Sequence, residues 1–252
     1  MDRSIYTAMT GASQSLEQQA IISNNLANSS TTGFQAQLSA MRAVPVQGET
    51  LPTRTLVVAS TPGTLTTPGP LDYTERPLDV AVQDQGWLAV QLPNGQEAYT
   101  RNGNMQEDNT GQLTIQGYPV VGQAGPVVVP TQAAITLGAD GTVSALGDGD
   151  QPDTIEDVGQ LKLVKPDPGQ LVRGDDGLFH LTPAATAQVG DTLPADATVK
   201  VMPGVLEGSN VNTAEALVDM IGTARRFEMQ MKVVSDADDN AEKANELLTL
   251  SS

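Results

Sequence analysis

Both ends of the chain place apolar residues at intervals of three and four, the spacing that puts them on one face of an α-helix. The stretch from Ser4 to about Asn28 contains no proline and one glycine, so little in it opposes a helix. A second pattern predicts a helix from about Thr213 to Leu248, with Asn212 or Thr213 as its N-cap. The expected stripes contain Ile5, Met9, Ala12, Leu16, Gln19, Ser23 and Leu26 in the first segment, and Leu217, Met220, Ala224, Phe227, Met231, Val234, Asp238, Ala241, Asn245 and Leu248 in the second.

The middle of the chain alternates short apolar runs with turn-forming residues, which is typical of β-strands. Turn sequences such as Pro93-Asn94-Gly95 separate several of these runs. We therefore predict an α+β fold, with a mainly β central domain flanked by N- and C-terminal amphipathic, coiled-coil-like helices that pack together. The expected strands are Leu78–Val82, Trp87–Leu92, Glu97–Arg101, Leu113–Gln116, Val127–Val129, Ile135–Leu137 and Leu161–Val164.

These patterns divide the chain into three regions. Residues 1–40 and 208–252 are expected to form a terminal helical assembly domain, and residues 77–207 a β-rich central domain. Residues 41–76 are rich in Pro and Thr, so we expect an extended linker or a hairpin there.

The chain is strongly acidic, with a formal net charge of −17. Affinity for nucleic acids comes mainly from Lys and Arg that neutralise phosphates, so no binding to nucleic acid is expected. The absence of cysteine removes disulfides and thiolate chemistry. The N-terminus lacks the apolar run of a cleavable signal peptide, and no stretch approaches the roughly 20 apolar residues of a membrane span.

Candidate residues for catalysis or metal binding are few. The only histidine, His180, has no cysteine to complete a zinc site, and we interpret it as structural. The acidic residues in 148–153 and 236–239 lack the spacing of a calcium loop, so they predict a solvated turn and a solvated helix face, the second able to fray its helix. With no Gly-x-Ser-x-Gly elbow and no triad, we expect no enzyme, no cofactor and no small-molecule substrate.

The N-terminal segment is only marginally stable as an isolated helix. Ordering its roughly 25 residues costs about 1–2 kcal/mol each, whereas each large apolar side chain returns about 1.5–3 kcal/mol on full burial. It therefore needs a partner, either the C-terminal segment or another copy of the chain. The periodicity leaves two arrangements open: a helical hairpin within one subunit, or helices that also pack against neighbours.

Residues 24–34, NNLANSSTTGF, favour the second arrangement. In this stretch Asn28 can end the helix, Gly33 can take a positive φ and Phe34 can anchor the turn. It resembles the N-terminal signature of flagellar axial proteins. Residues 77–113, PLDVAVQDQGWLAVQLPNGQEAYTRNGNMQEDNTGQL, resemble the β domain of rod and hook proteins, and residues 208–234, GSNVNTAEALVDMIGTARRFEMQMKVV, resemble their C-terminal helix entry. The resemblance is to the flagellar basal-body rod protein family.

Within this family the opening MDRSIYTAM and the length are most similar to the proximal rod branch, and the distal rod protein FlgG is the nearest rival. Residues 40–60 do not align with the extra segment typical of FlgG-like chains, which also favours the proximal branch. The alternative from another functional class is a secreted β-rich binding or adhesin module with helical ends.

The resemblance implies a structural subunit of the proximal rod, which polymerises into the shaft that transmits motor torque to the hook. Such subunits pass through the flagellar type III export apparatus without a cleavable signal and assemble in the periplasm. The implied partners are further copies, the other proximal rod subunits and FlgG. The residues expected at the assembly interface are Ile5, Met9, Leu16, Asn24, Asn25, Leu26, Asn28, Gly33, Phe34, Leu217, Met220, Ile221, Phe227, Met231 and Val234.

Overall fold

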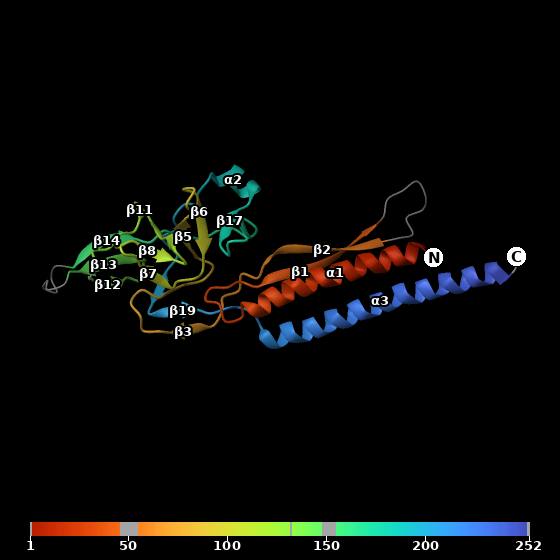
Figure 1. Ribbon diagram of the computed structural model, residues 1–252. Helices are drawn as coiled ribbons and strands as arrows, with labels where there is room; N and C mark the ends of the chain where they lie inside the picture. Colours follow the sequence, from red (N-terminus) through yellow and green to blue (C-terminus); the bar gives the residue numbers. More distant parts are fainter. Residues whose placement is uncertain (1, 46–54, 132, 148–154, 251–252) are drawn as a thin grey trace. The chain divides into compact units, whose positions relative to one another are not determined.

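The computed structural model describes residues 2–45, 55–131, 133–147 and 155–250 (Figure 1). Its contacts divide the chain into two compact units. The helical unit contains residues 1–28, 37–62 and 211–252, and the β unit contains residues 29–36 and 63–210. The chain therefore passes between the units at four points, after residues 28, 36, 62 and 210.

The helical unit is built on two long helices that lie side by side and antiparallel (Figure 1). Helix α1 (Asp2–Ala27) has 26 residues and helix α3 (Thr213–Leu250) has 38. The start of α1 and the end of α3 lie at the same end of the pair (Figure 1). Strands β1 (Gln37–Pro45) and β2 (Thr55–Thr64) are hydrogen-bonded to each other, and β1 also contacts α1. The prediction of terminal helices that pack together is confirmed.

Local side-chain bonds fix the ends of both helices. The Nδ2 of Asn28 donates to the carbonyl of Asn24 at 2.8 Å, which satisfies a carbonyl of the last turn of α1. The Oδ1 of Asn212 accepts from the backbone N–H groups of Ala214 and Glu215 at 3.1 and 3.2 Å, so Asn212 is the N-cap of α3. The expected fraying at residues 236–239 is wrong, because α3 continues through them; aspartate lowers helix propensity only modestly.

The β unit contains short antiparallel strands in several small sheets instead of one large sheet. The largest sheet has the order β15-β5-β6-β17-β16, which are Leu163–Val164, Trp87–Gln91, Glu97–Thr100, Phe179–Leu181 and Leu171–Arg173. Two three-stranded sheets have the orders β7-β8-β9 (Met105–Glu107, Leu113–Ile115 and Tyr118–Pro119) and β12-β13-β14 (Ala134–Leu137, Thr142–Leu146 and Glu156–Gln160). The remaining pairs are β10 (Val121–Gly122) with β11 (Gly125–Pro126), β18 (Val201–Pro203) with β4 (Val80–Val82), and β19 (Val205–Glu207) with β3 (Leu71–Tyr73); helix α2 is Pro183–Val189.

The five-stranded sheet carries apolar side chains on both faces. Successive residues of a strand point to opposite faces, and β5 uses both: Leu88 and Val90 belong to the larger core cluster, whereas Trp87 and Ala89 belong to a second cluster. In the second cluster the rings of Trp87 and Phe179 lie 4.5 Å apart between centroids. The β unit therefore has two cores that share one sheet.

Six of the seven predicted strands are present, with differences at some of their ends. Residues 127–129 do not form a strand; Val128 makes a single bridge to Gln112. Prolines at 126 and 130 flank this segment and cannot donate to a ladder. The strand expected at 113–116 ends at Ile115, because Gln116 has a positive φ of 54° in the turn that leads into β9. The prediction of an α+β fold is confirmed.

Candidate assembly interface

Helices α1 and α3 meet along a seam of small side chains. Ala12 and Ser15 of α1 and Thr223 of α3 are buried in it, at 6%, 1% and 0% exposure. The Oγ of Ser15 lies 3.0 Å from the Oε1 of Gln230, and an added Cβ on Gly11 would lie 2.8 Å from the Nε2 of the same glutamine. Small residues allow this close approach, and a polar pair marks one position along it.

At alternate positions of the predicted stripe on α3, the residue that lies in the seam is the one before the predicted residue. Met220, Phe227 and Val234 are half-buried, as the stripe requires. Leu217 and Met231, however, are exposed at 49% and 45%. Their places in the seam are taken by the preceding residues, Ala216 and Gln230, which are less exposed. Met231 therefore lies outside the seam within the subunit, and its place at an assembly interface stays a prediction.

Helix α1 shows the same offset. Ile5 and Leu26 are half-buried, but Met9 and Leu16 are exposed at 54% and 52%. The seam instead contains the residue before each of them, Ala8 and Ser15. The seam therefore does not follow the largest apolar residue of each turn, although Ile22 of α1 is buried at 7% exposure.

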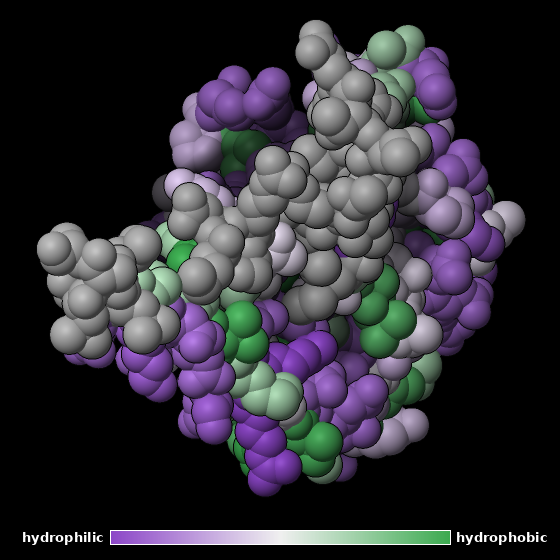
Figure 2. Space-filling view, turned by 90° about the vertical axis from the view of Figure 1, so that its right-hand side faces the viewer, coloured by the Kyte–Doolittle hydropathy of each residue, from purple (hydrophilic) through white to green (hydrophobic). Residues whose placement is uncertain are grey.

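Several large apolar side chains of both helices lie at the surface. Ile221 of α3 is exposed at 56% and Tyr6 of α1 at 68%. Apolar patches also lie between hydrophilic ones on the face drawn in Figure 2. The exposed set on α1 and α3 contains Tyr6, Met9, Leu16, Leu217, Val218, Ile221, Met229, Met231 and Val233. We call it the outer apolar set.

The Thr-Gly-Phe turn has the conformation predicted for it. Gly33 has a φ of 67°, which favours glycine, and an added Cβ there would lie 2.3 Å from the backbone N of Asn102. Phe34 is 5% exposed, and the guanidinium carbon of Arg173 lies 4.2 Å from its ring centroid. The predicted positive φ of Gly33 and the predicted anchoring of the turn by Phe34 are confirmed, whereas their place at an assembly interface stays a prediction.

The two asparagines Asn24 and Asn25, before this turn, make different hydrogen bonds. Asn24 is exposed and offers its backbone carbonyl to Asn28. The side chain of Asn25 donates to the carbonyl of Gln37 and accepts from its N–H, both at 2.9 Å. Asn25 thereby fixes the first residue of β1 against the last turns of α1.

Sequence reasoning missed a cluster of four polar residues, of which Gln35, Arg101 and Glu207 are buried and Asn210 is half-buried. Arg101 and Glu207 form an ion pair in which each side chain is 1% exposed, and Gln35 and Asn210 bind beside it. No periodicity indicates such a group, because its members are far apart in the chain. Only their place in the sequence could have pointed to them, because all four lie in or beside the segments that resemble the rod family.

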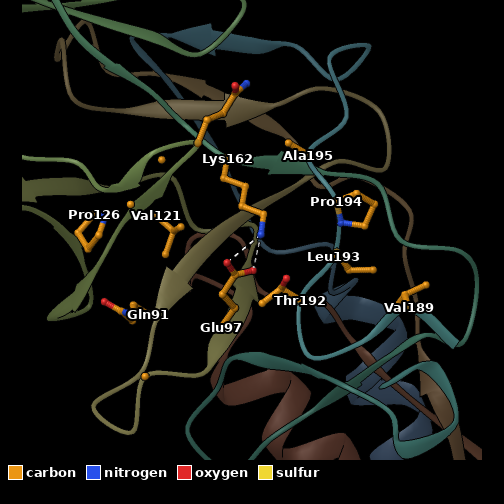
Figure 3. A pocket seen from close by; sticks show the side chains of 14 residues that line it. Gln91, Glu97, Val121, Pro126, Lys162, Val189, Thr192, Leu193, Pro194 and Ala195 are labelled. Carbon is orange, nitrogen blue, oxygen red and sulfur yellow. Dashed lines mark hydrogen bonds and ion pairs between the residues drawn. The ribbon is translucent and has the colours of Figure 1, made fainter. Parts of the chain in front are cut away.

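A groove of about 760 Å³ crosses the β unit between the β10–β11 hairpin and residues 189–195 (Figure 3). In it the Nζ of Lys162 donates to both carboxylate oxygens of Glu97, at 2.8 and 2.7 Å. The hydroxyl of Tyr99 donates to Glu97 at 3.3 Å and accepts from the N–H of Leu193 at 2.8 Å. Burial, with the nearby Glu97 charge adding to it, raises the pKa of Tyr99 to about 12. These groups satisfy one another's hydrogen bonds.

The remaining candidates for chemistry are His180 and the two acidic segments. The Nε2 of His180 lies 3.0 Å from both carboxylate oxygens of Asp176. Within residues 2–45, 55–131, 133–147 and 155–250, no group of three or more His, Asp or Glu could hold a metal ion. The acidic residues 148–153 lie outside the described residues. No helix in the described part of the chain is both long and apolar enough to cross a bilayer.

Comparison with known proteins identifies the family. The model described as Flagella basal body rod protein matches residues 5–35, Flagellar hook protein FlgE/F/G D1 domain matches residues 81–145, and Flagellar basal body rod FlgEFG protein C-terminal matches residues 202–247. The chain is 62% identical over 251 residues to flagellar basal-body rod protein FlgF of Escherichia coli K12, covering 100% of both chains. The chain belongs to the family of flagellar basal-body rod proteins.

Other relatives separate the branches of this family. Flagellar basal-body rod protein FlgF of Salmonella typhimurium LT2 is 60% identical, with 100% of both chains covered. Flagellar basal-body rod protein FlgG of Buchnera aphidicola subsp. Acyrthosiphon pisum is 32% identical, with 97% of this chain and 99% of the relative covered. The rod subunit is thus nearer to these FlgF proteins than to this FlgG, which confirms the predicted branch. It is a structural subunit of the bacterial flagellar basal-body rod.

Proposed function

We propose that this rod subunit polymerises through its terminal segments, residues 1–40 and 208–252, into the proximal rod that transmits motor torque to the hook. Residues 41–76 link these segments to a central body formed by residues 77–207. The partners are further copies, the other proximal rod subunits and a distal rod protein of the FlgG kind. The subunit leaves the cytoplasm through the flagellar type III export apparatus without a cleavable signal, assembles in the periplasm, and carries out no catalysis.

The observation that carries this proposal is the outer apolar set. Each exposed large apolar side chain gains about 1.5–3 kcal/mol on full burial, and the α1–α3 seam leaves these side chains outside. Large exposed apolar surface on a protein is typical of an interaction site. Neighbouring subunits that present the same helices supply a complementary apolar surface.

Charge supports the same arrangement. Residues 1–60 contain Arg3, Arg42 and Arg54 against Asp2, Glu17 and Glu49, so their formal charges cancel, although the whole chain has a net charge of −17. A neutral segment packs against copies of itself with little repulsion, whereas strongly acidic surfaces repel each other. The terminal segment that precedes the β unit is thus suited to lateral contact between subunits.

The test introduces a carboxylate into the outer apolar set. A charge buried without a partner in a packed interface costs several kcal/mol, whereas the same change on a solvated helix face usually alters stability by less than about 0.5 kcal/mol. Ile221→Asp should therefore abolish swimming and incorporation into isolated basal bodies while leaving the melting temperature of the purified subunit nearly unchanged. Ser235→Asp, at another exposed position of α3, is the matched control and should swim normally.

Two results would contradict the proposal. Normal swimming of an Ile221→Asp strain would show that this surface is not covered in the rod. A large decrease in the melting temperature of the purified variant would show that Ile221 is needed inside the subunit, and that the outer apolar set is not free for neighbours.

A further inference from the structure

The β unit contains a buried polar cluster where three stretches of chain meet. Its members are Gln35, Arg101, Glu207 and Asn210, which we call the junction cluster. Gln35 and Glu207 are 1% and 0% exposed, and Arg101 is 2% exposed. Charged side chains are seldom buried to this degree unless they are paired.

Every donor of the Arg101 guanidinium has an acceptor. Its Nε donates to Glu207 Oε2 at 2.7 Å, and its Nη2 reaches the same carboxylate and the carbonyl of Val82. Its Nη1 donates to the carbonyls of Asp84 and Gly86 at 2.9 and 2.8 Å. Arginine thus uses its whole planar fork, which no apolar side chain and no lysine can reproduce.

The second oxygen of Glu207 binds two other stretches. Its Oε1 accepts from the Nε2 of Gln35 at 3.1 Å and from the backbone N–H of Gly69 at 3.0 Å. One carboxylate is therefore bound at once by the residue after the Thr-Gly-Phe turn, by the stretch after β2 and by Arg101 at the end of β6. Each partner that is displaced leaves a buried charge or amide unsatisfied.

Asn210 repeats this three-way connection. Its Nδ2 lies 2.8 Å from Gln35 Oε1 and 2.7 Å from the carbonyl of Leu65, and its Oδ1 accepts from the N–H of Ala36 at 2.7 Å. Backbone bonds complete the connection: the N–H of Gly33 donates to the carbonyl of Glu207 at 2.7 Å. The three stretches are bound to each other by side chains and by backbone.

The stretches bound in this way are those by which the chain enters and leaves the β unit. The chain crosses between units after residues 28, 36, 62 and 210, and the cluster binds residues 33–36, 65–69 and 207–210. The three matched family segments also meet here: residues 5–35 contribute Gln35, residues 81–145 contribute Arg101, and residues 202–247 contribute Glu207 and Asn210.

We infer that Arg101 and Glu207 are positioning residues, which specify a single mutual placement of the three connecting stretches and thereby make the subunit competent to assemble. A buried ion pair is a weak source of stability, since apolar residues of similar volume often replace it without loss. It is a strong source of specificity, because alternative placements of the stretches leave its charges unpaired. This inference rests on the proposed function.

The test separates placement from stability. Arg101→Met with Glu207→Leu replaces the pair by apolar side chains, and Lys162→Met with Glu97→Leu removes the more exposed ion pair of the groove as the matched control. Because the chain lacks cysteine, cysteines introduced at the exposed positions Thr66 and Asn109 alone would carry spin labels. Pulsed EPR distances, unfolding midpoints and incorporation into basal bodies are then measured on the full chain.

We expect the Arg101→Met, Glu207→Leu chain to keep a folded β unit, with a broadened Thr66–Asn109 distance distribution and at least a tenfold loss of incorporation. The control pair should keep the narrow distribution and incorporate normally. A narrow distribution with normal incorporation of the Arg101→Met, Glu207→Leu chain would overturn the inference.

If the Arg101→Met, Glu207→Leu chain does not fold, the Glu207→Gln variant replaces it, because this change removes the charge and keeps the side-chain shape. Its distance distribution and its incorporation into basal bodies are then measured below its own unfolding midpoint. A broadened distribution with lost incorporation supports the inference, and a narrow one with normal incorporation overturns it. Failure of the unsubstituted chain to enter basal bodies would instead refute the proposed function.

Discussion

The two units of this rod subunit place their large apolar side chains in opposite ways. In the β unit Leu113 and Ile115 are fully buried, and the surrounding strands form two cores on one sheet. In the helical unit the seam holds Ala12, Ser15 and Thr223, while residues such as Ile221 lie outside. The β unit is thus stabilised by its own contacts, whereas the helical unit leaves many of its large apolar side chains exposed.

This difference shows that an amphipathic pattern does not reveal which face of a helix meets which partner. Large residues on α1 and α3 indicate a buried face, but the closest contact inside the subunit is made by small residues. The helices therefore combine a seam within the subunit with exposed apolar side chains outside it, which we propose meet neighbouring subunits. The following predictions test whether the two units really differ in this way.

The largest expected effect is that of creating a cavity in the β core. Leu113→Ala should lower the free energy of unfolding by about 2–5 kcal/mol, because it removes buried methyl groups and leaves a cavity. Leu217→Ala, an identical change at an exposed position, should cost less than about 0.5 kcal/mol. Urea unfolding of both purified variants measures the difference, and equal costs would remove the distinction between the units.

The next effect concerns the Thr-Gly-Phe turn in the β unit. An L-residue in the left-handed conformation costs about 1–2 kcal/mol, and at Gly33 the new Cβ would also lie 2.3 Å from the backbone N of Asn102. Gly95 has a φ of 83° with nothing within 4 Å of an added Cβ. Gly33→Ala should therefore destabilise more than Gly95→Ala in thermal unfolding. Equal destabilisation would mean that the close approach to Asn102 is not rigid.

A smaller effect is expected in the helical seam. Gln230→Ala removes the side chain that lies over Gly11 and against Ser15, and the loss of one such contact costs about 0.5–1.5 kcal/mol. Circular dichroism at 222 nm during thermal unfolding would report it. Lys232→Ala, at an exposed position of the same helix, should leave the transition unchanged; a larger effect at Lys232 would place the seam on the wrong face.

The smallest expected effect depends on pH. Hydrogen bonds from the side chain and then the backbone N–H of Thr198 hold the pKa of Asp196 below its usual range. A carboxyl group whose pKa is lower in the folded state stabilises the fold above its unfolded pKa of about 3.9, and this contribution is lost as the pH falls through the folded value.

Asp196→Ala should accordingly lower the melting temperature slightly at pH 7, and the difference from the unsubstituted chain should vanish in strong acid. The deficit of Gln230→Ala should persist there, because an amide does not titrate. A pH-independent deficit for Asp196→Ala would show that its hydrogen bonds do not depend on the charge.

The features that the sequence predicted correctly are local ones. Asn28 and Asn212 end and begin helices through bonds to residues two to four positions away, and Gly33 takes the φ that its turn requires. The short apolar runs between turn residues likewise predicted strands β4, β5, β6, β8, β12 and β15 of the β unit. Each of these features depends on neighbours along the chain, so its signal is present in a short window of sequence.

Tertiary structure decided the features that depend on how closely distant segments approach. Ser15 lies in the seam and Leu16 outside it because α1 and α3 approach closely at this point. The sequence does not predict this placement, since two heptad stripes offset by one residue have similar patterns. The pairing of Arg101 with Glu207 joins residues 106 positions apart. Periodicity indicates on which face of its own helix or strand a side chain lies, whereas its burial depends on which other segments pack against that face.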